Sequence, residues 1–310
     1  MEKSFTYIAF GINLRSEKLE LPELISSSNR KLNDLNIIQN NSSNWPKIKK
    51  SEYDTTFLKI QKNDLRLEIK GIGKFRITNG KLIEWERESE NVSDSDLRTF
   101  LLGSAFGAIL IQRGITTFHA NALEKNGKGI ICLGRSGVGK STIAYALIQD
   151  GWNLIADDLV ALNEDGYILP GIPRIKLWHD SAFSFGLDPK KLTKVRKGIY
   201  KYSLTGQQIP KTFSPVPLKC MYRISSQRIY QSENINNLNK IKNEKDSMII
   251  LRNNLFRPRF IRGLGQESRC FGFISNLSKN YLLMNLSAPN GIENMQNWVK
   301  KVDLNNSRYD

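Results

Sequence analysis

The chain has few of the residues that build disulfide frameworks and metal centres. Its 310 residues include three cysteines and two histidines. Cys132, Cys220 and Cys270 are far apart and odd in number, so we predict neither a disulfide framework nor a zinc site. With only His119 and His179, a histidine-rich metal site is not expected either.

Long apolar runs are also missing. The most apolar stretch, residues 105–111, is far shorter than the ~20 residues of a transmembrane helix. The first residues mix polar and apolar side chains, unlike the apolar core of a signal peptide. We therefore expect a cytoplasmic protein with reduced thiols and no membrane contact.

Acidic residues are scarce relative to basic ones. There are 46 Lys and Arg against 30 Asp and Glu, a formal net charge of +16, and residues 171–230 hold twelve of the basic residues with two acids. A basic surface attracts phosphate-bearing or acidic partners, although a basic face that only aids solubility explains it equally. The chain has no zinc finger, RNA-recognition motif or basic coiled coil, so we do not expect nucleic acid as a partner.

Residues 1–94 are predicted to form a β-rich N-terminal module. Residues 65–69 alternate like a half-buried strand, and residues 75–85 form a hairpin pattern around Asn79 and Gly80, which favour a type I′ turn. The polar segment 26–51 is predicted to be a loop. A helix capped by Ser93 or Ser95 opens the second domain.

Residues 95–310 are predicted to form an α/β domain with a C-terminal α/β extension, and a homo-oligomer is compatible with the sequence. The pattern of strand, loop, helix and strand predicts a βαβ unit with parallel pairing, at 129–133, 134–139, 140–149 and 152–156. Residues 231–254 are predicted to be an exposed connection, and residues 281–302 a strand followed by a helix.

A complete phosphate-binding motif lies between the first strand and the helix of this unit. Residues 134–141 match G-x-x-x-x-G-K-[ST]. The glycines let successive N–H groups point at phosphate oxygens, and the helix N-terminus adds its positive end. Lys140 supplies a charge for the β- and γ-phosphates, and Ser141 ligates Mg²⁺. We predict ATP and Mg²⁺ as cofactors, bound by Gly134, Arg135, Ser136, Gly137, Val138, Gly139, Lys140, Ser141 and Thr142.

Asp157 and Asp158 follow the second strand of the unit, near the sheet edge where ligands bind. A P-loop protein uses one such acid on Mg²⁺, so the other is available to accept a proton from an attacking hydroxyl. Two close carboxylates raise the pKa of one of them, which suits a base. His119 precedes the loop strand and can tune an aspartate. With Lys140, these residues form the predicted catalytic set.

The run from His119 through the phosphate loop to Asp157 and Asp158 resembles the catalytic domain of the HPr kinase/phosphorylase family. The resemblance implies a P-loop kinase fold related to phosphoenolpyruvate carboxykinase, and transfer of phosphate from ATP to a protein serine. It further implies that Asp157 is the base, that Asp158 pairs with His119, and that Ser141 binds Mg²⁺. We place Asp158 with Ser141 among the predicted metal ligands.

The sequence departs from this family after the aspartates. In place of the family's Leu-Glu-Ile-Arg-Gly-Leu-Gly segment, which includes a metal-binding glutamate, residues 169–178 read Leu-Pro-Gly-Ile-Pro-Arg-Ile-Lys-Leu-Trp. The sequence therefore leaves open what replaces this glutamate at the second metal position, and whether the reverse, phosphorylase reaction occurs. The β-rich front, the Pro-Gly-Ile-Pro-Arg segment and residues 256–262 resemble a divergent HPr-kinase-related group that includes lasso-peptide precursor kinases.

Basic residues beyond the aspartates are the predicted substrate contacts. Arg174 and Lys176 are placed to face the mouth of the site. Arg196 and Lys197 lie in a lysine-rich loop that can close over the phosphate, or that is simply solvated.

Three functions stay open on the sequence alone. We favour a kinase that phosphorylates a serine of a protein or peptide, with a lasso-peptide precursor as the preferred acceptor. The second is a small-metabolite kinase on the same scaffold. The third is a non-catalytic NTP-binding protein with a basic partner-binding face.

Overall fold

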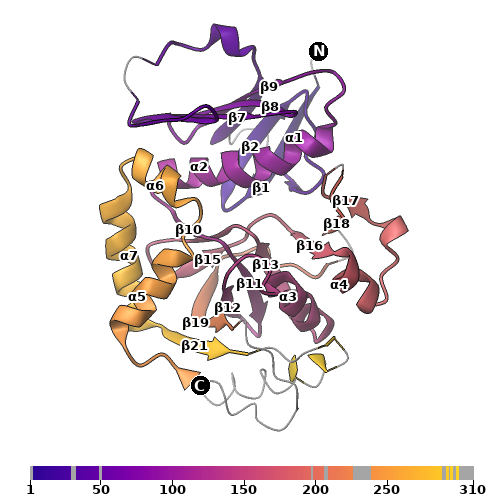
Figure 1. The fold of residues 1–310 in the computed structure, drawn as a ribbon, viewed down its shortest axis with the longest axis vertical. Helices are drawn as coiled ribbons and strands as arrows, with labels where there is room; N and C mark the ends of the chain where they lie inside the picture. The colour runs from indigo at the N-terminus through magenta and orange to yellow at the C-terminus, as the bar shows by residue number, and fades with distance from the viewer. Residues whose placement is uncertain are drawn as a thin grey trace.

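The computed structural model describes residues 3–28, 33–48, 51–196, 198–205, 209–225, 239–287, 291–292, 294–295 and 298–299. They form a mixed α/β protein built on three sheets, as the sequence predicts. Figure 1 shows the N-terminal sheet at one end, a helical segment beneath it, and the second sheet with its own helices beyond that segment.

The N-terminal sheet has nine described strands, which confirms the predicted β-rich front. In spatial order they are β3 (Ile25–Ser26), β1 (Ser4–Ala9), β2 (Ile12–Glu17), β4 (Leu35–Gln39), β9 (Leu82–Arg87), β8 (Gly73–Thr78), β7 (Asp64–Ile69), β6 (Leu58–Gln61) and β5 (Tyr53–Asp54).

The predicted hairpin is present as β8 and β9. Asn79 and Gly80 have φ angles of 54° and 63°, as a type I′ turn requires. The N–H of Lys81 donates to the carbonyl of Thr78 over 3.0 Å and closes the turn.

The loop predicted for residues 26–51 is wrong in part, because it contains β4. This strand lies between β2 and β9, parallel to both, and buries Leu35 and Ile37. Two inward side chains among polar neighbours are too short a pattern to reveal a strand. Residues 29–32 and 49–50 lie outside the described part of the chain.

One helical segment packs on the N-terminal sheet. It runs through α1 (Asp94–Phe100), the π-type turn η2 (Leu101–Ala105) and α2 (Phe106–Gln112). Ser93 caps it, since its hydroxyl accepts a bond from the N–H of Asp96 over 3.2 Å. Leu97 and Phe106 share one core with the strands. The boundary at residues 94 and 95 stays a prediction.

The second sheet carries the phosphate loop. Its main path is β10 (Thr116–Phe118), β14 (Val160–Leu162), β15 (Tyr167–Leu169), β19 (Val216–Ile224), β12 (Lys128–Leu133), β11 (Ala120–Lys125) and β13 (Asn153–Asp157). Beside β19 lie β21 (Leu282–Leu286) and β20 (Asn239–Lys240).

The predicted parallel pairing of the two strands around the phosphate loop is wrong. β12 and β13 point the same way, but β11 lies between them and is antiparallel to both. The tight turn at Asn126 and Gly127, both with positive φ, folds β11 and β12 into a hairpin. β12 instead finds its parallel partner in β19.

Helices cover both faces of the second sheet. α3 (Lys140–Gln149) packs on one face, and α5 (Glu244–Asn253) and α7 (Glu267–Asn280) pack on the other. Ile130 of β12 packs in the core under α3, and Ile131 packs in the core under α5 and α7. This is the pattern of a strand buried on both sides. α6 (Pro258–Gly263) reaches the core of the N-terminal sheet.

The C-terminal predictions have mixed outcomes. α5 shows that residues 231–254 are not only an exposed connection, since Leu251 is buried against the second sheet. The apolar residues of this helix, Met248 to Leu251, are consecutive, so they show no helical period. Residues 226–238 are outside the described range. β21 confirms the predicted strand, and the helix predicted after it falls largely on residues that the structure does not describe.

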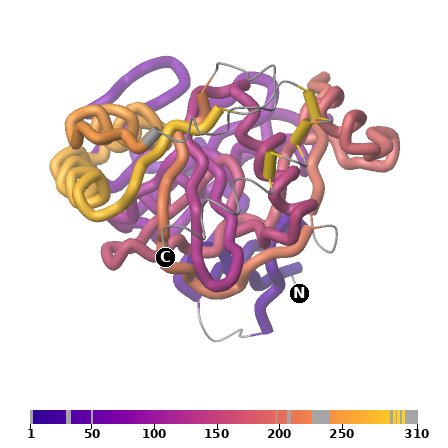
Figure 2. The backbone as a smooth tube through the Cα atoms, turned by 90° about the horizontal axis from the view of Figure 1, so that it is seen from below, coloured from indigo at the N-terminus to yellow at the C-terminus, as the bar shows by residue number. Residues whose placement is uncertain are grey.

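A small third sheet lies beside the phosphate loop, on the side opposite the C-terminal helices (Figure 2). We call it the flap: β16 (Arg174–Trp178), β18 (Lys201–Thr205), β17 (Thr193–Lys194) and α4 (His179–Ser184). Alternation along β16 sends Ile175 and Leu177 into the core around α3, while Lys176 and Trp178 line a cavity at the phosphate loop.

Membrane-spanning helices and disulfides can be checked across the described residues. Among the described helices, none combines the length and apolar character needed to cross a membrane. Cys132, Cys220 and Cys270 are buried and form no disulfide among the described residues, and burial raises the pKa of the Cys132 thiol to about 12.

The close approach of α2 to the segment after α5 gives a stability prediction. A Cβ at Gly107 would lie 2.4 Å from the ring of Phe256, whereas a Cβ at Gly103 would meet nothing within 4 Å. We expect Gly107→Ala to lower the free energy of unfolding by about 1–3 kcal/mol. Gly103→Ala, the matched control, should be neutral or stabilising by up to about 1 kcal/mol. Urea unfolding measures both, and equal stabilities would contradict the packing.

Candidate functional site

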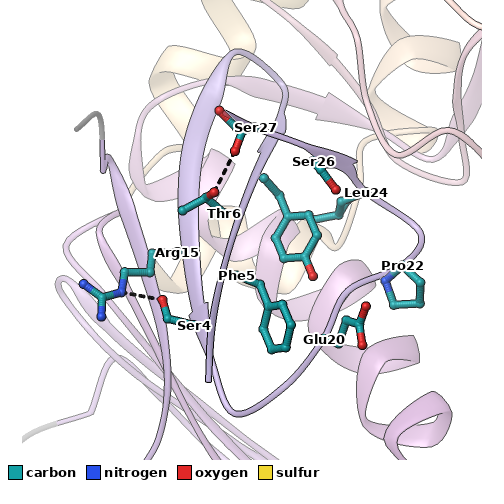
Figure 3. A pocket seen from close by; sticks show the side chains of 10 residues that line it. Ser4, Phe5, Thr6, Arg15, Glu20, Pro22, Leu24, Ser26 and Ser27 are labelled. Atoms are coloured by element: carbon teal, nitrogen blue, oxygen red, sulfur yellow. Dashed lines mark hydrogen bonds between the residues drawn. The ribbon is translucent and has the colours of Figure 1, made fainter. Parts of the chain in front are cut away.

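Two cavities stand out in the described structure, and only one contains predicted site residues. The larger, about 580 Å³, lies beside β1 on the N-terminal sheet, where Phe5, Pro22 and Leu24 line it (Figure 3). The smaller, about 330 Å³, lies between the phosphate loop and the flap. Its lining is His119, Ser136, Gly137, Gly139, Lys140, Ser141, Thr142, Asp158, Lys176, Leu177, Trp178, Ser181 and Lys201.

The phosphate loop wraps around its own lysine. The ammonium of Lys140 donates to the carbonyls of Gly134 and Arg135, at 2.7 and 3.1 Å. Gly139, with φ of 99°, ends the loop as the N-cap of α3, a conformation that favours glycine. Phosphate oxygens can replace the two carbonyls as partners of Lys140, so the loop has the groups of an anion site. Gly134, Arg135 and Val138 belong to the loop without lining the cavity.

Asp157 is enclosed behind Ser141. Its Oδ1 accepts from the Asn121 amide at 2.8 Å and from the Ser141 hydroxyl at 3.1 Å, and its Oδ2 accepts from the N–H of Lys176 at 3.0 Å. Burial and the neighbouring charge of Asp158 raise the pKa of Asp157. This carboxylate therefore has both oxygens engaged and does not line the cavity.

Asp158 is turned toward the cavity. Its φ of 68° is unusual for a non-glycine residue and directs the side chain away from that of Asp157. Its Oδ2 accepts from the ammonium of Lys176 at 2.6 Å. Burial works against ionisation, but the charges of Lys176 and Lys201 outweigh it, so the pKa of Asp158 is lowered. The two adjacent carboxylates thus occupy different environments.

His119 lies between β10 and β11 and lines the cavity. Its Nδ1 is 3.2 Å from the backbone carbonyl of Asp158, so this hydrogen bond is to the main chain of Asp158, where the resemblance implied a side-chain pair. Burial and the charge of Lys140 lower the pKa of His119, which favours a neutral ring. Nδ1 must carry the proton to donate to that carbonyl, leaving Nε2 as an acceptor.

The predicted substrate residues are separated by the fold. Lys176 lines the cavity. Arg174 is buried two residues earlier on the same face of β16, 4.0 Å from Glu23 of the N-terminal sheet region. Arg196 lies over the ring of Phe100, 6.0 Å from its centroid, and does not line the cavity. Lys197 lies outside the described residues.

Six residues of the site were not singled out from the sequence, among them Leu177 and Ser181, which line the cavity. Lys201 and Trp178 face each other across β16 and β18, with the Lys201 ammonium 5.6 Å from the Trp178 ring. Asn121 holds Asp157, and Asn254 holds the phosphate loop. No local motif marks them, because strand register and a distant helix bring them to the site.

Sequence comparisons single out the same region. Residues 113–173 match the family model of the HPr Serine kinase C-terminal domain. The HPr kinase/phosphorylase of Prosthecochloris aestuarii is 41% identical over 49 residues, which are 16% of this chain and 14% of that protein. The Geobacillus sp. HPr kinase/phosphorylase is 36% identical over 89 residues, 28% of this chain and 29% of that protein.

Among solved structures, the Hpr(Ser) kinase/phosphatase from Coxiella burnetii aligns with a TM-score of 0.32 at 16% identity, covering 63% of this chain and 94% of that one. The matched stretches span less than a third of these two curated relatives. The similarity to the HPr Serine kinase C-terminal domain thus covers residues 113–173, which carry His119, the phosphate loop and both aspartates.

Proposed function

We propose that this protein is an ATP-dependent kinase that transfers the γ-phosphate to a serine hydroxyl of a protein or peptide. The observation that carries the proposal is one cavity lined by Lys140, Ser141 and Asp158 together. A phosphate grip and a carboxylate that can take a proton are the two requirements of transfer to an alcohol. The kinship of residues 113–173 with HPr kinases supports the same chemistry.

Nucleotide binding falls to the phosphate loop. Backbone N–H groups of the loop and the N-terminus of α3 would hold the phosphates, and Lys140 would exchange its two loop carbonyls for β- and γ-phosphate oxygens. These contacts grip the triphosphate before any chemistry and fix the direction of its terminal phosphate.

Ser141 and Asp157 fit Mg²⁺. Their oxygens lie 3.1 Å apart, and a hydroxyl with a carboxylate is the hard donor set that Mg²⁺ takes alongside nucleotide phosphates. The described residues contain no cluster of three or more His, Cys, Asp or Glu side chains, which suits a metal that draws its other ligands from phosphate and water. When bound, Mg²⁺ would neutralise phosphate charge.

Asp158 is the better placed general base. A base must lie within hydrogen-bond reach of the proton that it takes, and Asp158 lines the cavity while both oxygens of Asp157 are engaged. This exchanges the roles predicted from the sequence, which were a base at Asp157 and a metal ligand at Asp158. In this proposal Asp157 serves the metal with Ser141, and Asp158 faces the acceptor hydroxyl.

Lys176 links proton transfer to phosphate binding. It neutralises Asp158 at 2.6 Å, and a phosphoryl group arriving between them would give its ammonium a new partner. Asp158, freed from that pair, becomes more basic when the acceptor hydroxyl is in place. Lys201, on the neighbouring strand β18 of the flap, also lines the cavity and would share the negative charge that develops on the transferring group.

The acceptor is a serine of a polypeptide in this proposal, and a lasso-peptide precursor is the acceptor we favour. The basic surroundings support an acidic or phosphate-carrying partner, since twelve Lys and Arg with two acids lie in residues 171–230. Trp178, 54% exposed at the cavity, supplies an apolar contact for the acceptor chain.

The assignment of Asp158 gives a sharp expectation. Asp158→Asn should lower phosphoryl transfer by about 10²–10⁴-fold, because an amide cannot accept the proton. Affinity for ATP should change little. Incubation with labelled ATP, Mg²⁺ and candidate peptides or small hydroxy compounds measures transfer, and a fluorescent ATP analogue measures binding.

Asp165→Asn, which alters an exposed acid in the turn before β15, is the matched control and should behave as wild type. Label on a small hydroxy compound alone would replace the polypeptide acceptor with a metabolite. ATP binding with no transfer to any acceptor, together with salt-sensitive retention of nucleic acid, would support the non-catalytic alternative.

The assignment of Asp157 predicts a metal phenotype. Asp157→Asn should raise the Mg²⁺ concentration needed for half-maximal ATP binding by about tenfold or more, because a charged oxygen ligand is lost. Titration of Mg²⁺ against the fluorescent ATP analogue measures the shift, and EDTA should abolish the Mg²⁺-dependent part of binding in the wild type. If Asp158→Asn shifts the Mg²⁺ requirement and Asp157→Asn does not, the two roles are reversed.

A further inference from the structure

Asn254 joins two parts of the site that are far apart in sequence. It follows the last turn of α5, and its side-chain Oδ1 accepts from the N–H of Gly134 at 2.8 Å. Its backbone carbonyl accepts from the N–H of His119, also at 2.8 Å. One residue therefore holds the first glycine of the phosphate loop and the histidine of the cavity.

The orientation of the Asn254 amide is fixed from within α5. Its Nδ2 donates to the carbonyl of Ile250 at 2.8 Å. A flipped amide would set its NH₂ group against the N–H of Gly134 and its oxygen against the carbonyl of Ile250, so both bonds would be lost. The helix thus determines which atom meets the phosphate loop.

Both backbone groups of Gly134, its N–H and its carbonyl, are hydrogen-bonded to side chains. Asn254 binds its N–H, and the ammonium of Lys140 binds its carbonyl. A side chain has no room here, because a Cβ at Gly134 would lie 3.0 Å from Val138 and 3.3 Å from the carbonyl of Ile224. When Lys140 turns to phosphate, the bond from Asn254 is the one that stays.

The segment after Asn254 extends the same connection. Phe118 and Leu255 form an antiparallel bridge, and the N–H of Phe256 donates to the carbonyl of Thr117 at 2.9 Å. These bonds continue β10 up to His119, whose ring reaches the backbone of Asp158. The end of α5 therefore connects the phosphate loop with the segment that faces the base.

We propose that Asn254 is a positioning residue that keeps the entrance of the phosphate loop in its binding shape and in register with His119. The inference rests on the proposed nucleotide site. It gives the C-terminal helices a part in catalysis: they carry no cavity-lining side chain among the described residues, and they reach the site through Asn254 and the two residues after it. Loss of the amide loosens the loop while Lys140 is engaged by phosphate.

The test is Asn254→Ala, with Asn253→Ala as the matched control on the neighbouring, exposed position. We expect Asn254→Ala to weaken binding of the fluorescent ATP analogue about tenfold, the size of one lost hydrogen bond at about 1.4 kcal/mol. Hydrogen–deuterium exchange in the peptide containing Gly134 should speed up without nucleotide. Asn253→Ala should match the wild type in both.

A second variant separates positioning from folding. Asn254→Asp keeps an acceptor for Gly134 but sets a carboxylate oxygen against the carbonyl of Ile250, so it should also bind ATP more weakly. Circular dichroism at the assay temperature should show that both variants remain folded. Wild-type affinity and wild-type exchange at Gly134 in both variants would overturn the inference. A wild-type protein that binds no ATP would instead sink the proposed function, and the inference with it.

Discussion

The site depends on two adjacent carboxylates kept in different surroundings. Asp157 is buried and fully bonded next to Ser141, and Asp158, at positive φ, is turned to the cavity and held by Lys176. Burial and the charge of Asp158 raise the pKa of Asp157, whereas the charges of Lys176 and Lys201 outweigh burial and lower the pKa of Asp158. The turn at Asp158 is therefore what separates the metal-side acid from the acceptor-side base in the proposed mechanism.

The N-terminal sheet packs against the segment that follows the two aspartates, at Pro170 and Gly171. The N–H of Phe10, at the tip of the hairpin formed by β1 and β2, donates to the carbonyl of Pro170 at 2.7 Å. The aromatic ring of Phe10 fills the space at Gly171. A Cβ at Gly171 would lie 2.8 Å from Ala156 and 2.9 Å from this ring. Because Ala156 directly precedes Asp157, the packing of this module helps to fix where the strand delivers its carboxylates.

Much of the site was predictable because local sequence determines it. The glycine-rich loop, the helix after it and the Asp pair are contiguous patterns, and the structure brings Lys140, Ser141, Asp158 and His119 to one cavity. What could not be predicted depends on register and long-range packing. The strand β11 between β12 and β13 and the placement of Lys201 opposite Trp178 leave no periodic trace near the motif.

Local sequence also does not determine which way the side chains of Asp157 and Asp158 point. The resemblance to a known family predicts that both carboxylates belong to the site, but it does not predict where each side chain points. That direction depends on the backbone φ of Asp158 and on partners such as Asn121 and Lys176. Asp157 is the last residue of β13, and its carboxylate is bonded to Ser141 and Asn121. Asp158 lies just past the strand, where its positive φ is combined with a bond from Lys176 at the cavity. These partners are the reason why the proposed acceptor-side role falls to Asp158.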